Sequence, residues 1–224
     1  TSGSMFYYDE TGVKREDAME AAVIDLMGDL DTLVAEQEED GRILRTGMVP
    51  YYDRVWSSHV VDMNWGTIPV SDISRLYEGG GTNSSGAMEE AELWMQSENA
   101  VHQSETGRDN PKKYVVFMTD GVNNSSSYDT DTITACNAMK AAGVEVYTIG
   151  YALTQQTYGS GQYRYGTERT YTPSAAEIAQ ATALLSDCAS SASHFKTTST
   201  TTDLDAIFDG IGADIAQNTM RISH

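Results

Sequence analysis

Apolar side chains recur along the chain at two different spacings, and these predict two kinds of element. Steps of three and four residues are typical of helices that pack one face on a core. This spacing predicts helices over residues 16–39, 85–97, 130–142, 173–188 and 204–215. Short runs that are continuously apolar are typical of strands buried on both faces of a parallel sheet. Such runs occupy residues 114–118 and 144–151.

The order of these elements predicts the fold class. A strand, a helix and a second strand imply a right-handed crossover between parallel strands. Residues 42–50 and 54–62 predict an antiparallel hairpin around a short turn, and residues 194–197 a small edge strand. We therefore expect one α/β domain over residues 1–224, with a doubly wound, mostly parallel central sheet and helices on both faces.

Two segments depart from this alternation. Residues 154–172 are rich in Tyr, Gly, Gln and Thr without any period, which predicts a long exposed loop. The polar opening Thr1-Ser2-Gly3-Ser4 precedes the first helix, yet no apolar strand comes before it. We therefore expect the chain to be truncated at its N-terminus and its first central strand to be missing.

Composition narrows the set of partners. The 224 residues carry a formal net charge of −19, from 33 acidic and 14 basic side chains. Such a charge repels nucleic acids and anionic membrane surfaces.

Cys136 and Cys188 are the only cysteines, too few for a structural zinc site, which leaves a disulfide or two free thiols. The histidines are scattered without any ligand spacing.

Hydroxyl and carboxylate side chains follow three of the predicted elements. Ser2 and Ser4 lie after the missing strand, Thr82 follows a run of three glycines, and Asp120 follows the strand at 114–118. In open α/β sheets, ligands bind at the carboxyl ends of the strands. Hard oxygen donors of this kind suit Mg²⁺, with Ca²⁺ or Mn²⁺ as alternatives. A site with so few carboxylates leaves the charge of the cation and its coordination shell incomplete, and a carboxylate of a partner can complete both.

These segments resemble the metal-ion-dependent adhesion site of the von Willebrand factor type A (VWA) family. That site reads Asp-x-Ser-x-Ser, then a Thr in a Gly-rich loop, then an Asp after a hydrophobic strand. Thr1-Ser2-Gly3-Ser4-Met5 matches the first motif except for its leading Asp, which would fall just before Thr1. Gly80-Gly81-Thr82-Asn83 and Phe117-Met118-Thr119-Asp120-Gly121 match the others. The resemblance implies that Ser2, Ser4, Thr82 and Asp120 hold the metal.

Within that family, the chain is most similar to the C-terminal domain of TadG-like proteins of bacterial tight-adherence pili. The matching segments are 136–150, 184–189 and 220–224. This resemblance implies a Cys136–Cys188 disulfide, an upstream membrane anchor, and a location in the periplasm or outside the cell. It also implies a protein partner, either a pilus component or a surface ligand that supplies a carboxylate.

The predicted topology sends several tyrosine-bearing segments to the same edge of the sheet as the metal. Rigid amphipathic rings are favoured at binding faces. We therefore expect a partner-binding rim made of Tyr7, Tyr8, Tyr128, Tyr158, Tyr163, Tyr165 and Tyr171.

The sequence favours a non-enzymatic, metal-ion-dependent protein-binding module of a bacterial surface or pilus-assembly protein. One alternative is a structural VWA-like domain with an empty metal site. Another is an enzyme that binds a phosphorylated cofactor at the Gly-rich loop. Against the enzyme, glycines 79–81 lack the GxGxxG order and no Lys-Ser or Lys-Thr pair follows them. No nucleophile elbow surrounds Ser4 either.

Overall fold

The computed structural model describes residues 3–36, 43–77, 79–164 and 167–220. In chain order the elements are η1 (Gly3–Phe6), α1 (Arg15–Glu36), β1 (Arg45–Met48), η2 (Ser57–His59), β2 (Val61–Trp65), α2 (Val70–Ile73), α3 (Ser85–Thr106), β3 (Tyr114–Thr119), α4 (Ser126–Ala141), β4 (Glu145–Tyr151), β5 (Tyr158–Arg164), β6 (Thr167–Tyr171), α5 (Ala175–Cys188), β7 (Phe195–Thr198) and α6 (Thr201–Met220).

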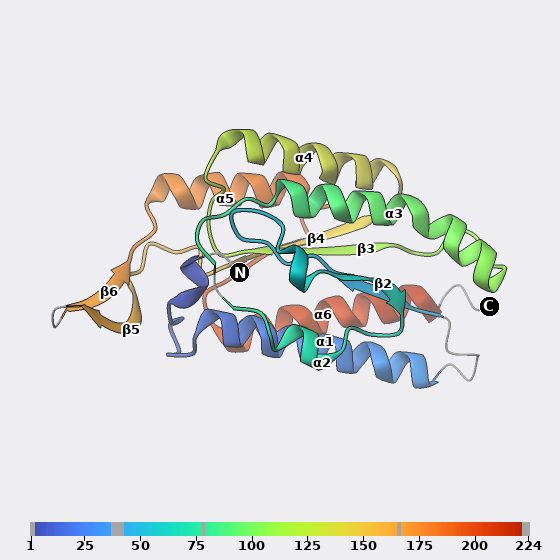
Figure 1. Ribbon diagram of the computed structural model, residues 1–224, viewed down its shortest axis with the longest axis horizontal. Helices are drawn as coiled ribbons and strands as arrows, with labels where there is room; N and C mark the ends of the chain where they lie inside the picture. The colour runs from blue at the N-terminus through green and yellow to red at the C-terminus, as the bar shows by residue number, and fades with distance from the viewer. Residues whose placement is uncertain (1–2, 37–42, 78, 165–166, 221–224) are drawn as a thin grey trace.

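A parallel sheet in the order β3-β4-β7 forms the middle layer, and the α/β prediction is confirmed. Helices α1, α2 and α6 lie on one side of this sheet, and α3, α4 and α5 lie on the other (Figure 1). The side chains of β4 are buried after its first residue, whereas those of β3 are mostly half-buried. Among the described residues, no strand pairs with the edge of β3 that faces away from β4. This edge of β3 is therefore open in the part of the chain that the structure describes.

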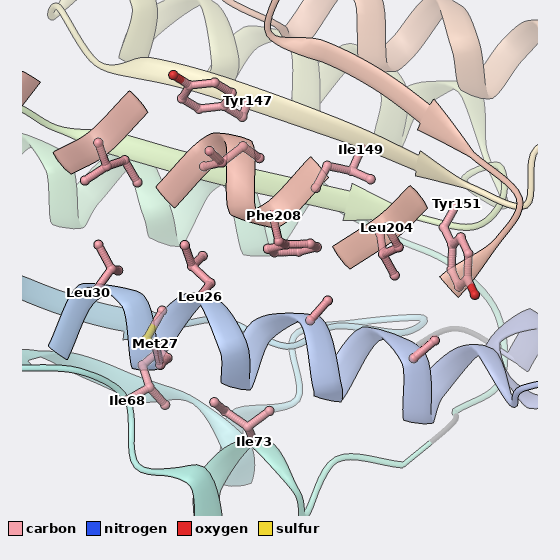
Figure 2. Packing of buried hydrophobic residues seen from close by; sticks show 14 of the residues in the cluster. Leu26, Met27, Leu30, Ile68, Ile73, Tyr147, Ile149, Tyr151, Leu204 and Phe208 are labelled. Carbon is pink, nitrogen blue, oxygen red and sulfur yellow. The ribbon is translucent and has the colours of Figure 1, made fainter. Parts of the chain in front are cut away.

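Each face of the sheet has its own hydrophobic core, because side chains alternate along β4. Tyr147 and Ile149 pack with α1 and α6, where Figure 2 shows Leu26 and Phe208 against them. Val146 points the other way and packs with residues of α3, α4 and α5. The regular alternation therefore places helices on both faces, as a doubly wound sheet requires.

The predicted β-hairpin is present, but its second strand begins later than expected. β1 pairs with β2 in antiparallel register, with Arg45 opposite Trp65, and the turn between them contains η2. The prediction of a strand at 54–62 was wrong because Trp56 belongs to an aromatic cluster instead of a ladder. Its ring lies 4.2 Å from that of Tyr77 and 3.9 Å from that of His59. Packing of these rings folds the segment into a compact turn.

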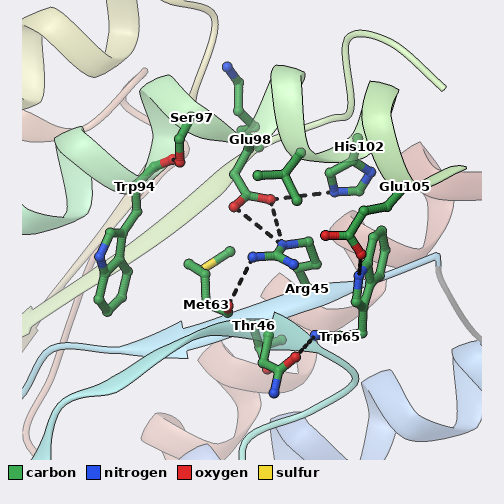
Figure 3. Close-up of polar contacts among 12 residues, drawn as sticks. Arg45, Thr46, Met63, Trp65, Trp94, Ser97, Glu98, His102 and Glu105 are labelled. Atoms are coloured by element: carbon green, nitrogen blue, oxygen red, sulfur yellow. Dashed lines mark hydrogen bonds and ion pairs between the residues drawn. The ribbon is translucent and has the colours of Figure 1, made fainter. Parts of the chain in front are cut away.

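A largely buried ion pair attaches the β1–β2 hairpin to α3 (Figure 3). Arg45 Nε lies 3.0 Å from Glu98 Oε2, and Arg45 Nη2 donates a hydrogen bond to the Met63 carbonyl at 2.9 Å. His102 Nε2 lies 3.5 Å from the same Glu98 oxygen. Desolvation by burial raises the pKa of Glu98 and lowers that of His102. These contacts hold the β1–β2 hairpin against α3, although no hydrogen bonds between strands join it to β3 among the described residues.

The segment at 154–172 is largely an antiparallel hairpin, so the prediction of a long exposed loop without strands was wrong. β5 and β6 pair from Tyr158 opposite Tyr171 to Arg164 opposite Thr167. The hairpin extends from the body near the start of α1 (Figure 1). Gly161 has a φ of 64° and a register shift accompanies it, which interrupts the regular alternation that would mark a strand in the sequence.

Asp9 ties the N-terminal segment to the end of β4 and the start of α6. One of its carboxylate oxygens accepts hydrogen bonds from Thr11 and from the Val13 N–H. The other accepts from the Tyr151 hydroxyl at 2.9 Å and from the Thr201 N–H at 2.9 Å. Desolvation by burial on its own raises the pKa of Asp9, but these hydrogen bonds together lower it to about 2.

We expect Asp9→Asn to lower the free energy of unfolding by about 2 kcal/mol at neutral pH. The folded pKa of about 2 lies below the ordinary value of 3.8 for an aspartate, so the stabilisation is present above pH 3.8 and is lost as the pH falls towards 2. Urea unfolding of wild type and variant should therefore show a difference that shrinks in this acidic window. Glu10→Gln, at the exposed neighbouring residue, is the control. A difference independent of pH would contradict the assignment.

Candidate functional site

The structure brings Ser4 and Asp120 together at the carboxyl end of β3. Asp120 directly follows the last residue of β3 and is buried. Ser4 lies in the short helix η1, and its Oγ donates a hydrogen bond to Asp120 Oδ1 at 2.8 Å. The two residues are 116 positions apart, so only the fold makes this contact. Ser2, the other serine of the predicted set, lies outside the described residues.

Thr82 lies beside the loop that follows Asp120. Its N–H donates to Asn124 Oδ1 at 3.1 Å, and the Asn124 N–H donates to the Thr82 carbonyl at 2.9 Å. A second pair of contacts joins the same two loops: Asn123 Oδ1 accepts from the Ser84 N–H at 2.9 Å, and Asn123 Nδ2 donates to Ser84 Oγ at 2.9 Å. The Gly-rich loop and the loop after β3 are thereby held against each other, with Thr82 buried between them.

A glycine is required next to Thr82. Gly81 has a φ of 69°, a conformation that other residues rarely adopt. A Cβ atom at this position would lie 2.7 Å from Asn124 Nδ2, closer than such atoms can approach. The run of glycines therefore allows the close approach of the two loops.

Arg15, the first residue of α1, contacts the same carboxylate, and the sequence did not point to it. Its Nη1 donates to Asp120 Oδ2 at 3.2 Å and to the Ser4 carbonyl at 3.5 Å. The guanidinium carbon lies 3.9 Å from the centre of the Tyr158 ring, a cation–π contact. The exposed fraction of the Arg15 side chain is 0% and that of Asp120 is 1%. An arginine that follows a lysine at a helix start ordinarily faces solvent, so no local signal marks this one.

Tyr51 is a second neighbour of the site that the sequence assigned only to a turn. Its hydroxyl donates to the Met118 carbonyl near the end of β3, at 2.8 Å. Burial raises the pKa of Tyr51, and the negative charge of Asp120 raises it further. The phenol therefore stays neutral and acts as a hydrogen-bond donor next to Asp120.

The tyrosines of the predicted rim are placed in several different ways. Tyr7 and Tyr171 are half-buried with ring centres 5.8 Å apart, and Tyr8 is 39% exposed. Tyr158 is buried beneath Arg15, so it cannot contribute to an exposed rim. Tyr128 is half-buried in the first turn of α4, whereas Tyr158 and Tyr171 belong to the β5–β6 hairpin.

The two remaining tyrosines of the predicted rim belong to the segment around the tip of the β5–β6 hairpin. Tyr163 lies opposite Glu168 in the hairpin, and Tyr165 falls outside the described residues. Burial, followed by the charge of Glu177, raises the pKa of Tyr171 to about 12, and the charge of Asp120 adds to this effect. Of the predicted tyrosines, Tyr171 thus lies close enough to Asp120 to be affected by its charge, and Tyr7 packs against Tyr171.

The disulfide is confirmed. Cys136 of α4 is bonded to Cys188 at the end of α5, and both side chains are fully buried. The bond joins two helices that cover the same face of the sheet (Figure 1). It lies in the core beneath these helices, among Met139, Leu184 and Leu185.

The donors at the site are hard oxygen ligands. Among the described residues, no group of three or more His, Cys, Asp or Glu side chains could hold a metal ion. A cation here would depend on one carboxylate, Asp120, together with hydroxyls and water, which is a donor set that suits Mg²⁺ better than a soft metal. The donor chemistry fits the ion, whereas the positive charge of Arg15 opposes it.

A parallel sheet with helices on both faces, and with Asp120 at the carboxyl end of β3, defines a domain of the doubly wound α/β class. The von Willebrand factor type A domain family matches residues 2–209, and the chain belongs to this family. No curated protein matches the chain.

Two solved structures share the fold. The pilus adhesin SpaC from Lactobacillus rhamnosus GG has a TM-score of 0.68 and 13% sequence identity, over 97% of this chain and 30% of that chain. The conserved hypothetical protein BatB from Bacteroides thetaiotaomicron has a TM-score of 0.61 and 13% identity, over 96% of this chain and 95% of that chain. The chain thus spans about 30% of SpaC and nearly all of the BatB structure. At such low identity the likeness concerns the fold alone.

Within the described residues, no helix combines the length and apolar character needed to cross a membrane.

Proposed function

We propose that this domain is a non-enzymatic protein-binding module that uses a divalent cation at Ser4, Thr82 and Asp120, with Ser2 as a further ligand. The observation that carries the proposal is the hydrogen bond from Ser4 Oγ to Asp120 Oδ1 at 2.8 Å. It joins two of the oxygen donors across the fold, and the Thr82 loop is bonded to the loop that follows Asp120.

The bound ion, Mg²⁺ or alternatively Ca²⁺ or Mn²⁺, would supply a positive centre for a carboxylate of the partner. Ser4 and Thr82 offer neutral hydroxyls, and Asp120 offers the single carboxylate among the described donors. Neutral ligands leave most of the ion's charge uncompensated, which favours capture of a further anionic ligand. Tyr7, Tyr8 and Tyr171 would provide aromatic contact surface beside it.

The biological setting that we propose is adhesion or pilus assembly at the bacterial cell envelope. The resemblance to TadG-like proteins supports this setting, and SpaC, which shares the fold, is a pilus adhesin. The Cys136–Cys188 disulfide is in keeping with an oxidising compartment, either the periplasm or the cell surface. The partner is a protein, such as a pilus component or a surface ligand.

Calorimetric titration of the full-length protein with Mg²⁺, Ca²⁺ and Mn²⁺ tests the cation. We expect binding by the wild type, loss of binding in Asp120→Asn, and weaker binding in Ser4→Ala. The amide keeps the shape of the carboxylate but removes its charge. Asp62→Asn, at an exposed position on β2, is the matched control and should bind as the wild type does. Unchanged affinity in Asp120→Asn would remove Asp120 from the site.

A second candidate is a domain of the same family that binds its partner without a metal. The contact between Arg15 Nη1 and Asp120 Oδ2 at 3.2 Å favours this candidate, because a positive charge already neutralises the carboxylate. The same titration separates the two functions. Absence of heat with all three ions would favour the metal-free module.

A further inference from the structure

Arg15 and Asp120 form an ion pair in the interior of the domain. The exposed fraction of the Arg15 side chain is 0% and that of Asp120 is 1%, so water screens their interaction very little. Ser4 donates to Oδ1 of Asp120 and Arg15 donates to Oδ2, so each oxygen of the carboxylate has a donor. A divalent ion at Asp120 would therefore meet a carboxylate that is already neutralised.

The guanidinium is held by few hydrogen bonds for a buried group. A guanidinium has five N–H donors. Nη1 contacts Asp120 and the Ser4 carbonyl, whereas buried Nε and Nη2 have no hydrogen-bond acceptor in the described structure. The Tyr158 ring, at 3.9 Å, compensates part of the charge from one face. Arg15 is thus paired to Asp120 through one nitrogen, with two further nitrogens available to other acceptors.

We propose that Arg15 is an internal counter-ion that competes with the divalent cation for Asp120, a proposal that rests on the function proposed above. Two positive centres at one carboxylate repel each other strongly where water is excluded. The ion can therefore be held only when the guanidinium releases Oδ2. The free Nε and Nη2 donors can then engage other acceptors, including the carboxylate of a partner. In this arrangement the partner and the ion together displace the Arg15 guanidinium from Asp120, and the ion alone binds weakly.

The test compares Mg²⁺ and Mn²⁺ binding by the wild type, Arg15→Met and Arg15→Lys in calorimetric titrations. Met fills similar volume without charge, so we expect affinity to rise by about tenfold or more. Lys keeps the positive charge next to Asp120, and its affinity should stay close to that of the wild type. Lys112→Met removes the same charge at an exposed position before β3, at the end of the strand opposite to Asp120, and is the matched control.

The outcomes separate this inference from the proposed function. Tighter binding by Arg15→Met than by Lys112→Met supports the inference, and so does binding by Arg15→Met alone. Equal or weaker binding by Arg15→Met, while the wild type binds, overturns the inference and leaves the cation site in place. If neither the wild type nor Arg15→Met binds an ion, the cation site is overturned, and the inference with it.

A measurement on the wild type keeps the inference testable if Arg15→Met does not fold. The Nε–H signal of Arg15 in a ¹⁵N NMR spectrum should shift when Mg²⁺ saturates the protein, because the guanidinium leaves Asp120. An unchanged Arg15 signal at saturation, with shifts at Asp120 and Gly121, would overturn the inference.

Discussion

Asp120→Ala is expected to lower the free energy of unfolding by about 3–5 kcal/mol, a large effect for a single substitution. The reason is the guanidinium of Arg15, which is fully buried and has Asp120 as its ion-pair partner at 3.2 Å. Removing one member of a buried pair leaves the other charge without compensation. Urea unfolding at neutral pH in metal-free buffer measures the change without a contribution from bound ions.

The double variant Arg15→Met/Asp120→Ala distinguishes this cause from simple loss of packing. Both charges are then absent, so its stability should exceed that expected from the sum of the single variants by more than 1 kcal/mol or so. Asp62→Asn is again a suitable control, since it removes a negative charge at an exposed position. Additive single effects would mean that Arg15 and Asp120 are not coupled, and would also weaken the counter-ion inference.

Removal of the disulfide is expected to lower the free energy of unfolding by about 4 kcal/mol on the chain-entropy estimate. The bond closes a loop with a sequence separation of 52, so the unfolded chain gains considerable freedom when it is absent. Cys136→Ala/Cys188→Ala also leaves space in a fully buried part of the core. Unfolding in urea, with and without a thiol reductant, measures the effect.

Two comparisons in the presence of a thiol reductant serve as controls for the disulfide experiment. The wild type should lose a similar amount of stability in reductant, and the double variant should be insensitive to it. A double variant as stable as the oxidised wild type would show that the core packing of α4 on α5 suffices without the bond.

Local pattern located the long helices and the buried strands, but it ended the helix at 85–97 too early, since α3 runs to Thr106, and it missed the short helix α2. The spacing of Leu26 and Leu30 predicted α1, and the continuous apolar run before Asp120 predicted β3. Both predictions rest on the spacing of apolar residues along the sequence, because this spacing reflects which faces of an element are buried. The same pattern failed for β5 and β6, since glycines and a register shift break their alternation. Their pairing depends on cross-strand hydrogen bonds, which leave little trace in a single sequence.

The candidate site likewise has features that the sequence predicts and features that only the tertiary structure decides. The sequence by itself predicted that Ser4, Thr82 and Asp120 lie at one edge of the sheet, because strand order and direction fix where the ends of strands lie. The structure joins Ser4 to Asp120 and bonds the Thr82 loop to the loop that follows Asp120. The tertiary structure alone decided that Arg15 turns inward to Asp120 and that Tyr158 lies beneath the guanidinium. Whether a charged side chain faces water or a buried carboxylate depends on segments far away in the chain. For Arg15 those segments are separated from it by more than a hundred residues.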